Sequence, residues 1–186
     1  MRALPLLPPG TSGTMQVPVV VTRNGVASAP INVKVGPAAP GIFTFQFGIG
    51  QAVAYGNVDG AIAAPGTATG LPATAHPAKI GDPQTLVILA TGLGPVDSTV
   101  ADGDVPQVAI ANTLTTPTVL VGNVPARVVF SGLVGRDAGG KVLGFVGVYQ
   151  LNIVIQPGTP TGDAIPLQIS MNGITSRSDV TIAVSQ

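Results

Sequence analysis

The sequence contains no cysteine, no glutamate and little charge of either sign. The absence of cysteine from all 186 residues excludes disulfide bridges and thiolate metal sites. Charged residues make up 9% of the chain, and all eight acidic residues are Asp. Because Glu, Lys and Arg normally populate exposed helix faces, their scarcity argues against helices. The formal net charge is zero and no basic cluster occurs, so the sequence predicts no nucleic-acid partner.

Long apolar runs are also missing. No stretch of eighteen or more apolar residues occurs, so we expect no membrane-spanning segment. The first nine residues hold one basic residue and a short apolar patch that prolines interrupt, which does not make a signal peptide. We therefore expect any export signal to lie outside this sequence.

The residues that are abundant predict an all-β fold. The chain has 25 Gly and 18 Pro, yet 45% of its residues are hydrophobic, which favours short strands and frequent turns over disorder. Alternating patterns bounded by turn residues predict eight strands in an immunoglobulin-like antiparallel β-sandwich of Greek-key type. The predicted strands are residues 42–47, 51–55, 85–91, 118–121, 126–130, 146–155, 165–171 and 180–184.

One internal repeat links the two ends of the chain. Residues 17–28 (VPVVVTRNGVAS) match residues 165–176 (IPLQISMNGITS) at a constant offset of 148. Each copy continues into an alternating strand, residues 31–35 and 180–184, with a slip of one residue. An Asn-Gly pair between two β-branched runs is a strong hairpin signal, because both residues tolerate a positive φ. The sequence therefore predicts two related hairpins.

The first hairpin predicts a divided chain. The Pro- and Gly-rich residues 36–41 form a short linker, so we expect a partial immunoglobulin-like unit in residues 1–38 and a complete sandwich in residues 39–186. We expect the first hairpin to be the last hairpin of an upstream sandwich whose other strands are missing. Its strand edges would then pair with its own sandwich, another protein or another copy of the chain. The residues predicted for this assembly edge are Val17, Val19, Val21, Ile31, Val33 and Val35.

Several stretches together resemble a known family. They are residues 19–28 (VVVTRNGVAS), 39–44 (APGIFT), 90–96 (ATGLGPV), 121–130 (VGNVPARVVF) and 147–155 (GVYQLNIVI), followed by the closing hairpin. This order resembles the C-terminal domain of large secreted proteins of Acidobacteria, often called the Solibacter-type C-terminal domain. The resemblance implies sandwiches of the IPT/TIG immunoglobulin type, an extracellular or cell-surface location and attachment to longer chains. It defines no catalytic residues.

Candidate chemistry is sparse. Asp97, Asp102 and Asp104 could bind calcium through clustered carboxylates in a flexible loop, although Asp and Gly also simply make turns. The single histidine, His76, is expected to be a solvated loop residue. No Gly-x-Ser-x-Gly elbow or complete dinucleotide fingerprint occurs, so we expect no enzyme and no cofactor other than this candidate calcium. Phe43, Phe45 and Phe47 alternate, and we interpret them as a core stripe rather than an exposed docking stripe.

Two functions remain open at this point. The first is a non-catalytic structural or adhesive module on the cell surface or outside the cell, which assembles by strand complementation. The second is a carbohydrate-binding module that uses the long loop of residues 57–82, with aromatic side chains exposed near Tyr55 or Tyr149. The partners would be proteins or further copies of this chain in the first case and a polysaccharide in the second.

Overall fold

The computed structural model describes residues 14–68, 70–71, 74–81, 85–101 and 104–186, which form β-strands and no helix. No helix in these ranges is therefore available to cross a membrane. The all-β prediction is confirmed. The strands up to β8 are β1 (Met15–Val19), β2 (Thr22–Arg23), β3 (Val26–Ala27), β4 (Ile31–Val35), β5 (Gly41–Ile42), β6 (Gly50–Gln51), β7 (Ala54–Gly56) and β8 (Ala78–Lys79). The others are β9 (Leu86–Thr91), β10 (Ile110–Asn112), β11 (Thr118–Val121), β12 (Val124–Val134), β13 (Tyr149–Val154), β14 (Gly162–Met171), β15 (Ile174–Thr175) and β16 (Val180–Ser185).

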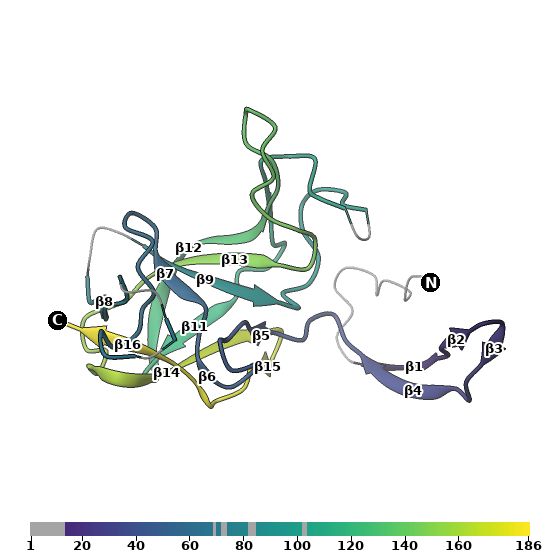
Figure 1. The fold of residues 1–186 in the computed structure, drawn as a ribbon, viewed down its shortest axis with the longest axis horizontal. Helices are drawn as coiled ribbons and strands as arrows, with labels where there is room; N and C mark the ends of the chain where they lie inside the picture. The colour runs from purple at the N-terminus through teal and green to yellow at the C-terminus, as the bar shows by residue number, and fades with distance from the viewer. Residues whose placement is uncertain (1–13, 69, 72–73, 82–84, 102–103) are drawn as a thin grey trace.

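Most of the strands belong to one large, curled sheet, which we call the body (Figure 1). Its order is β5-β9-β13-β12-β11-β14-β16-β6, and its pairs are antiparallel except where β16 meets β6 and β8. The two ends of this path meet at residues 50–53. The Ala52 N–H donates to Thr181 of β16 at 2.9 Å, and the Leu89 N–H of β9 donates to Val53 at 3.1 Å. The curl therefore satisfies backbone groups that a flat sheet would leave at open edges.

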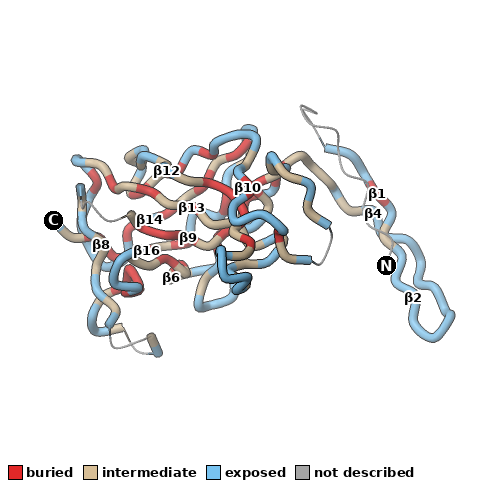
Figure 2. Tube along the Cα trace, turned by 90° about the horizontal axis from the view of Figure 1, so that it is seen from above, coloured by how far each residue is buried: buried red, intermediate tan, exposed pale blue. Residues whose placement is uncertain are grey.

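The core fills the inside of this curl. Strands rich in Val, Ile and Leu place alternate side chains inward, as period-two geometry requires. The buried cluster draws on β9, β11, β13, β14 and β16 (Figure 2). Its fully buried large side chains include Ile88, Val119, Val121, Leu151, Ile153, Leu167, Ile169 and Ile182.

The strand predictions are largely confirmed. The predicted strand 118–121 coincides with β11, and those at 85–91, 165–171 and 180–184 agree with β9, β14 and β16 to within a few residues. Residues 132–144 form a hairpin with an exposed tip at residues 137–141, closed by a bridge between Arg136 and Val142.

Two predictions need correction. The strand expected at residues 42–47 ends at Ile42, because the chain turns sharply at Phe47 (φ 56°), Gly48 (φ 108°) and Gly50 (φ 69°). The long loop of residues 57–82 also holds more structure than expected. Residues 61–64 are buried in the body, and β8 pairs with β16.

The first hairpin projects from one end of the body (Figure 1). We call residues 15–35 the arm, with β1 and β4 as its two long strands and β2 and β3 at its tip. The arm joins the body through Gly36 and Pro37, after which Ala38 is buried and the Ala39 N–H donates to Gly92 at 2.8 Å. Only two residues thus separate the end of the arm from its anchor in the body.

Candidate interaction surface

The arm and the closing hairpin share one strand register. In the arm, Val17 lies opposite Val33, and Pro18 lies opposite Asn32. In the closing hairpin, Ile165 lies opposite Ile182, and Pro166 lies opposite Thr181. The first strands of these pairs are related by the offset of 148 and the second strands by 149, which is the one-residue slip of the repeat. The predicted relation between the two hairpins therefore extends to their backbone pairing.

The turns of the two hairpins are equivalent as well. Asn24 and Gly25 have φ angles of 50° and 79°, and Asn172 and Gly173 have 51° and 78°. The same pair of hydrogen bonds between a serine and a residue seven positions earlier, which we call the serine clasp, follows each turn. The Ser28 N–H donates to the Val21 carbonyl while the Ser28 hydroxyl accepts from the Val21 N–H, and Ser176 makes both bonds with Ile169. Sequence, turn and clasp therefore make the arm a structural duplicate of the closing hairpin.

The two hairpins differ in what covers them (Figure 2). In the closing hairpin, β14 pairs with β11 and β16 pairs with β6 and β8. Within the described residues, β1 and β4 form a sheet of two strands, and their extensive contacts are with each other. Ile169 is fully buried, whereas its equivalent Val21 is 66% exposed, and Ile31 is 70% exposed.

The predicted assembly residues form one face of the arm. The register places Val17 and Val19 on the same face as Ile31, Val33 and Val35, and Met15 extends the row. Val21 follows at the next alternate position, two residues beyond the end of β1. Val17 is buried, Val19, Val33 and Val35 are half-buried, and Met15 is exposed like Val21 and Ile31. The sequence thus predicted the composition of this face, while its exposure toward the tip is a finding of the structure.

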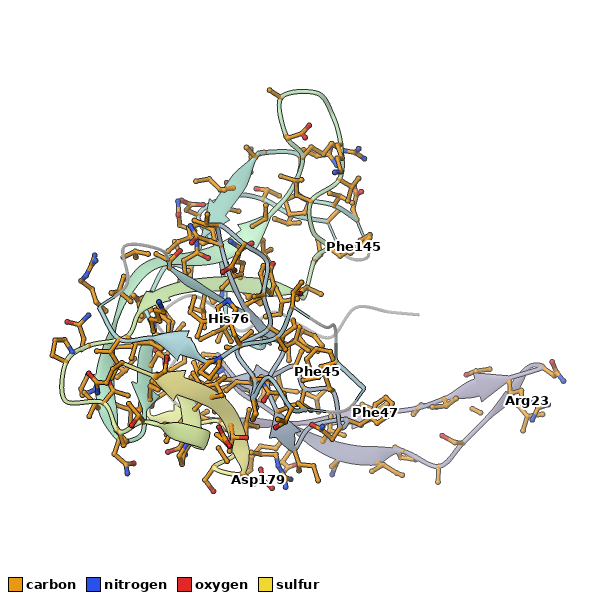
Figure 3. All side chains as sticks on the ribbon, turned by 60° about the vertical axis from the view of Figure 1, so that its left-hand side comes forward. Arg23, Phe45, Phe47, His76, Phe145 and Asp179 are labelled. Atoms are coloured by element: carbon orange, nitrogen blue, oxygen red, sulfur yellow. The ribbon has the colours of Figure 1, made fainter. Side chains whose placement is uncertain are left out.

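A second apolar surface lies at the end of the body from which the arm departs (Figure 3). We call residues 43–49 the aromatic loop, and its exposed side chains are Phe43, Phe45, Phe47 and Ile49. The interpretation of Phe43, Phe45 and Phe47 as a core stripe is therefore wrong. The alternation of the three residues suggested a strand, but the glycines at positions 48 and 50 were the signal for a turn instead.

Hydrogen bonds hold the aromatic loop in a defined shape. The Gly48 N–H donates to the Thr44 hydroxyl at 2.6 Å, and the Gln51 N–H donates to the Gln46 side-chain oxygen at 2.8 Å. The Phe45 N–H donates to the Gln51 carbonyl. Phe47 is fully solvent-exposed at the tip with a left-handed backbone, a conformation that costs free energy in a bulky residue. An aromatic side chain is thus presented to solvent from a fixed backbone.

The charges of the chain are distributed unevenly between its two parts. Residues 1–58 hold three basic residues and no acidic one, and the arm contributes Arg23 and Lys34. Residues 59–186 hold five basic residues and all eight Asp, which gives them a formal charge of −3 against +3 for the first part. The arm and the body are therefore of opposite sign.

The calcium candidate is only partly described by the structure, since Asp102 lies outside the described residues. The Asp97 carboxylate accepts hydrogen bonds from the backbone and side-chain amides of Asn112, both at 2.9 Å, and these bonds hold the pKa of Asp97 below its ordinary value. The Asp104 carboxylate accepts from the Val105 N–H. In the described part of the chain, no three His or Asp side chains are grouped closely enough to bind a metal ion.

His76 lies in a shallow pocket that Ala61, Ala63, Leu86 and Ile155 help to line. Its Nδ1 is 3.0 Å from the Pro77 carbonyl oxygen, and its Nε2 is 3.1 Å from an Asp59 carboxylate oxygen. Both ring nitrogens thus face acceptors, and only the imidazolium can donate to both. The interaction with Pro77, followed by that with Asp59, raises the pKa of His76 above 6.5.

This pair leads to a prediction about pH. Because the folded pKa lies above the unfolded value, the stabilisation is complete below about pH 6.5 and is lost as the pH rises through the folded pKa. Since His76 is about half exposed, solvent screening keeps the effect small. An NMR titration of the His76 ring should give a pKa above 6.5 in the parent chain and a lower one in Asp59→Asn. Equal values in the two proteins would contradict the assignment.

The two tyrosines do not form exposed platforms. Tyr55 and Tyr149 are each half-buried, and burial raises the pKa of both phenols. The Tyr149 hydroxyl donates to the Gly94 carbonyl. Two exposed phenylalanines lie near them in sequence: Phe47 precedes Tyr55 by eight residues, and Phe145, which is 63% exposed, precedes Tyr149 by four.

Comparison with known proteins finds no family model that matches the chain and no match among curated proteins or solved structures.

Proposed function

We propose that the protein is a non-catalytic structural or adhesive module that acts outside the cell or at the cell surface. In this proposal, the body is an immunoglobulin-like β-sandwich of the IPT/TIG type, in keeping with the resemblance to the Solibacter-type C-terminal domain. The arm is the element through which the module joins other copies of itself or other proteins. No cofactor takes part, and binding rather than chemistry is the activity of the molecule.

The observation that carries this proposal is the unequal burial of two equivalent hairpins. The closing hairpin buries Ile169 completely and pairs along both of its outer strands. The arm has the same register, turn and serine clasp but leaves Val21 and Ile31 largely in solvent. An isolated two-stranded ribbon is marginally stable in water, and unpaired strand edges favour pairing with another chain. A partner that covers the arm therefore buries its apolar face and pairs with its strand edges, as the body does for the closing hairpin.

Light scattering on a size-exclusion column tests the proposal directly. We expect the mean mass of the full chain to rise above 18.4 kDa as its concentration increases. Ile31→Asp should restore the monomer mass, because a carboxylate on the exposed apolar face would lose its hydration on docking. Val58→Asp, at an exposed site outside the arm, is the matched control and should assemble like the parent chain.

A chain that stays monomeric over the whole concentration range would contradict self-assembly. Hydrogen exchange gives a second readout, since the backbone amides of β1 and β4 should exchange more slowly in the assembled form. Equal exchange at all concentrations would also contradict the proposal.

A further inference from the structure

We infer that the arm docks on the aromatic loop of a second copy of this chain, in a reciprocal dimer with a two-fold axis. This inference rests on the proposed function and names the partner and the receiving surface. It starts from two exposed apolar surfaces that share one end of the molecule. They are the arm face, most exposed at Val21 and Ile31, and the aromatic loop, most exposed at Phe47 (Figure 3).

The arm has little freedom to cover the aromatic loop of its own chain. Only Gly36 and Pro37 lie between Val35, the last residue of β4, and the anchored Ala38. Proline fixes its own φ and restricts the residue before it, so a reversal of direction within this connection is disfavoured. In the structure, the arm extends away from the body (Figure 1). A second copy can bring its aromatic loop to the arm without any such reversal.

Two-fold symmetry allows both contacts to form at once. Since the arm and the aromatic loop lie at the same end of each molecule, two copies that meet end to end place each arm beside the loop of its partner. Such an interface uses the same surface on both copies and closes after two subunits. It therefore gives a defined dimer rather than an open filament.

The charges of the two parts favour the same contact. The arm carries Arg23 and Lys34 and no acidic residue, whereas the body from residue 59 onward has a formal charge of −3. Asp179 lies close to the aromatic loop, since its carbonyl accepts from the Gly50 N–H at 2.8 Å, and its carboxylate is paired with the Arg177 guanidinium. The attraction therefore comes from the net charge of the body rather than from Asp179. An arm of one sign that approaches a body of the other sign gains attraction and suppresses wrong pairings.

The size of the two surfaces is adequate for a dimer. Burial of one large apolar side chain removes on the order of 60–120 Å² from water. The arm contributes Met15, Val21, Val26 and Ile31, and the loop contributes Phe43, Phe45, Phe47 and Ile49. Eight such side chains supply several hundred Å² per copy, close to the roughly 800 Å² per partner of a standard interface. Phe47, an aromatic residue on a fixed backbone, is suited to be the anchor of the contact.

Two variants of the full chain test the inference through the dissociation constant of the dimer. Phe47→Asn removes the anchor, and it should fold because asparagine tolerates a positive φ. Ile31→Thr makes the arm face more polar and keeps its β-branched shape. Each should weaken dimerisation at least about tenfold in analytical ultracentrifugation, with the thermal midpoint of the isolated monomer unchanged. Val58→Ser, a similarly exposed site away from both surfaces, should leave the constant unchanged.

A crosslinking experiment locates the contact. The chain has no cysteine, so Ile31→Cys and Phe47→Cys each introduce a unique thiol. Mixed and oxidised, the two variants should form a disulfide-linked heterodimer in far higher yield than Ile31→Cys with the control Val58→Cys. Equal yields for the two mixtures would overturn the inference.

The outcomes separate this inference from the proposed function. If Ile31→Thr weakens the dimer and Phe47→Asn does not, the arm assembles on another surface, and only the inference fails. If Phe47→Asn weakens the dimer and Ile31→Thr does not, the arm takes no part in assembly, and both the inference and the proposed function fail. A parent chain that is monomeric at every concentration overturns both.

Discussion

Replacing Ile169 with alanine should lower the free energy of unfolding by about 3–4 kcal/mol, whereas Val21→Ala should lower it by less than about 0.5 kcal/mol. The two residues occupy equivalent positions in the repeated hairpins, and each is clasped by a serine seven residues later. Ile169 is fully buried, so its truncation leaves a cavity in the core, while Val21 is 66% exposed. The difference between the two losses of unfolding free energy measures how much packing in the body stabilises a hairpin residue.

Urea unfolding at protein concentrations that give the monomer mass is the appropriate measurement. The denaturant dependence should be the same for both variants, because both unfold the same body. Leu167→Ala and Val19→Ala form a second equivalent pair, with Leu167 fully buried and Val19 half-buried. Similar losses at Ile169 and Val21 would mean that the arm is packed on its own body in solution, against both the structure and the proposed role of the arm.

The repeat was the most informative feature of the sequence. Its Asn-Gly turns and alternating runs predicted both hairpins and the face on which Val17, Val33 and their neighbours lie. Local chemistry determines these properties, since a turn type sets the register and period two sets the face. Burial of a hairpin face depends instead on which other strands pack against it. The two hairpins have nearly equivalent sequences, but one face is buried and the other is largely exposed.

The curled shape of the body was beyond sequence reasoning for a related reason. The ends of the sheet meet at residues 50–53, which include β6, and β8 extends the same side of β16; β6 and β8 have two residues each and pair in parallel with β16. Strands this short carry no periodic pattern. The aromatic loop was missed because alternation at Phe43, Phe45 and Phe47 outweighed the glycines that follow. A tight turn at Gly48 and Gly50 takes these side chains out of the sheet.

Gly92→Ala should lower the free energy of unfolding by about 3 kcal/mol or more, because it combines backbone strain with a steric clash. Gly92 follows β9 with a φ of 70°, and a Cβ atom there would lie 2.0 Å from the Ala39 carbonyl oxygen. The clash is with backbone and cannot be relieved by a side-chain rotation. Gly92 also accepts the hydrogen bond from Ala39 that anchors the linker of the arm.

Gly158→Ala is the matched control for the effect of strain alone. Gly158 has a φ of 91°, but no atom lies within 4 Å of the position of its added Cβ. This variant should lose only about 1–2 kcal/mol in the same urea measurement. The additional loss of unfolding free energy in Gly92→Ala then measures the effect of the close approach between the linker and the end of β9. Since that approach fixes where the arm leaves the body, Gly92→Ala should also speed the exchange of the Ala39 amide, and equal losses in the two variants would show that the linker is not held there.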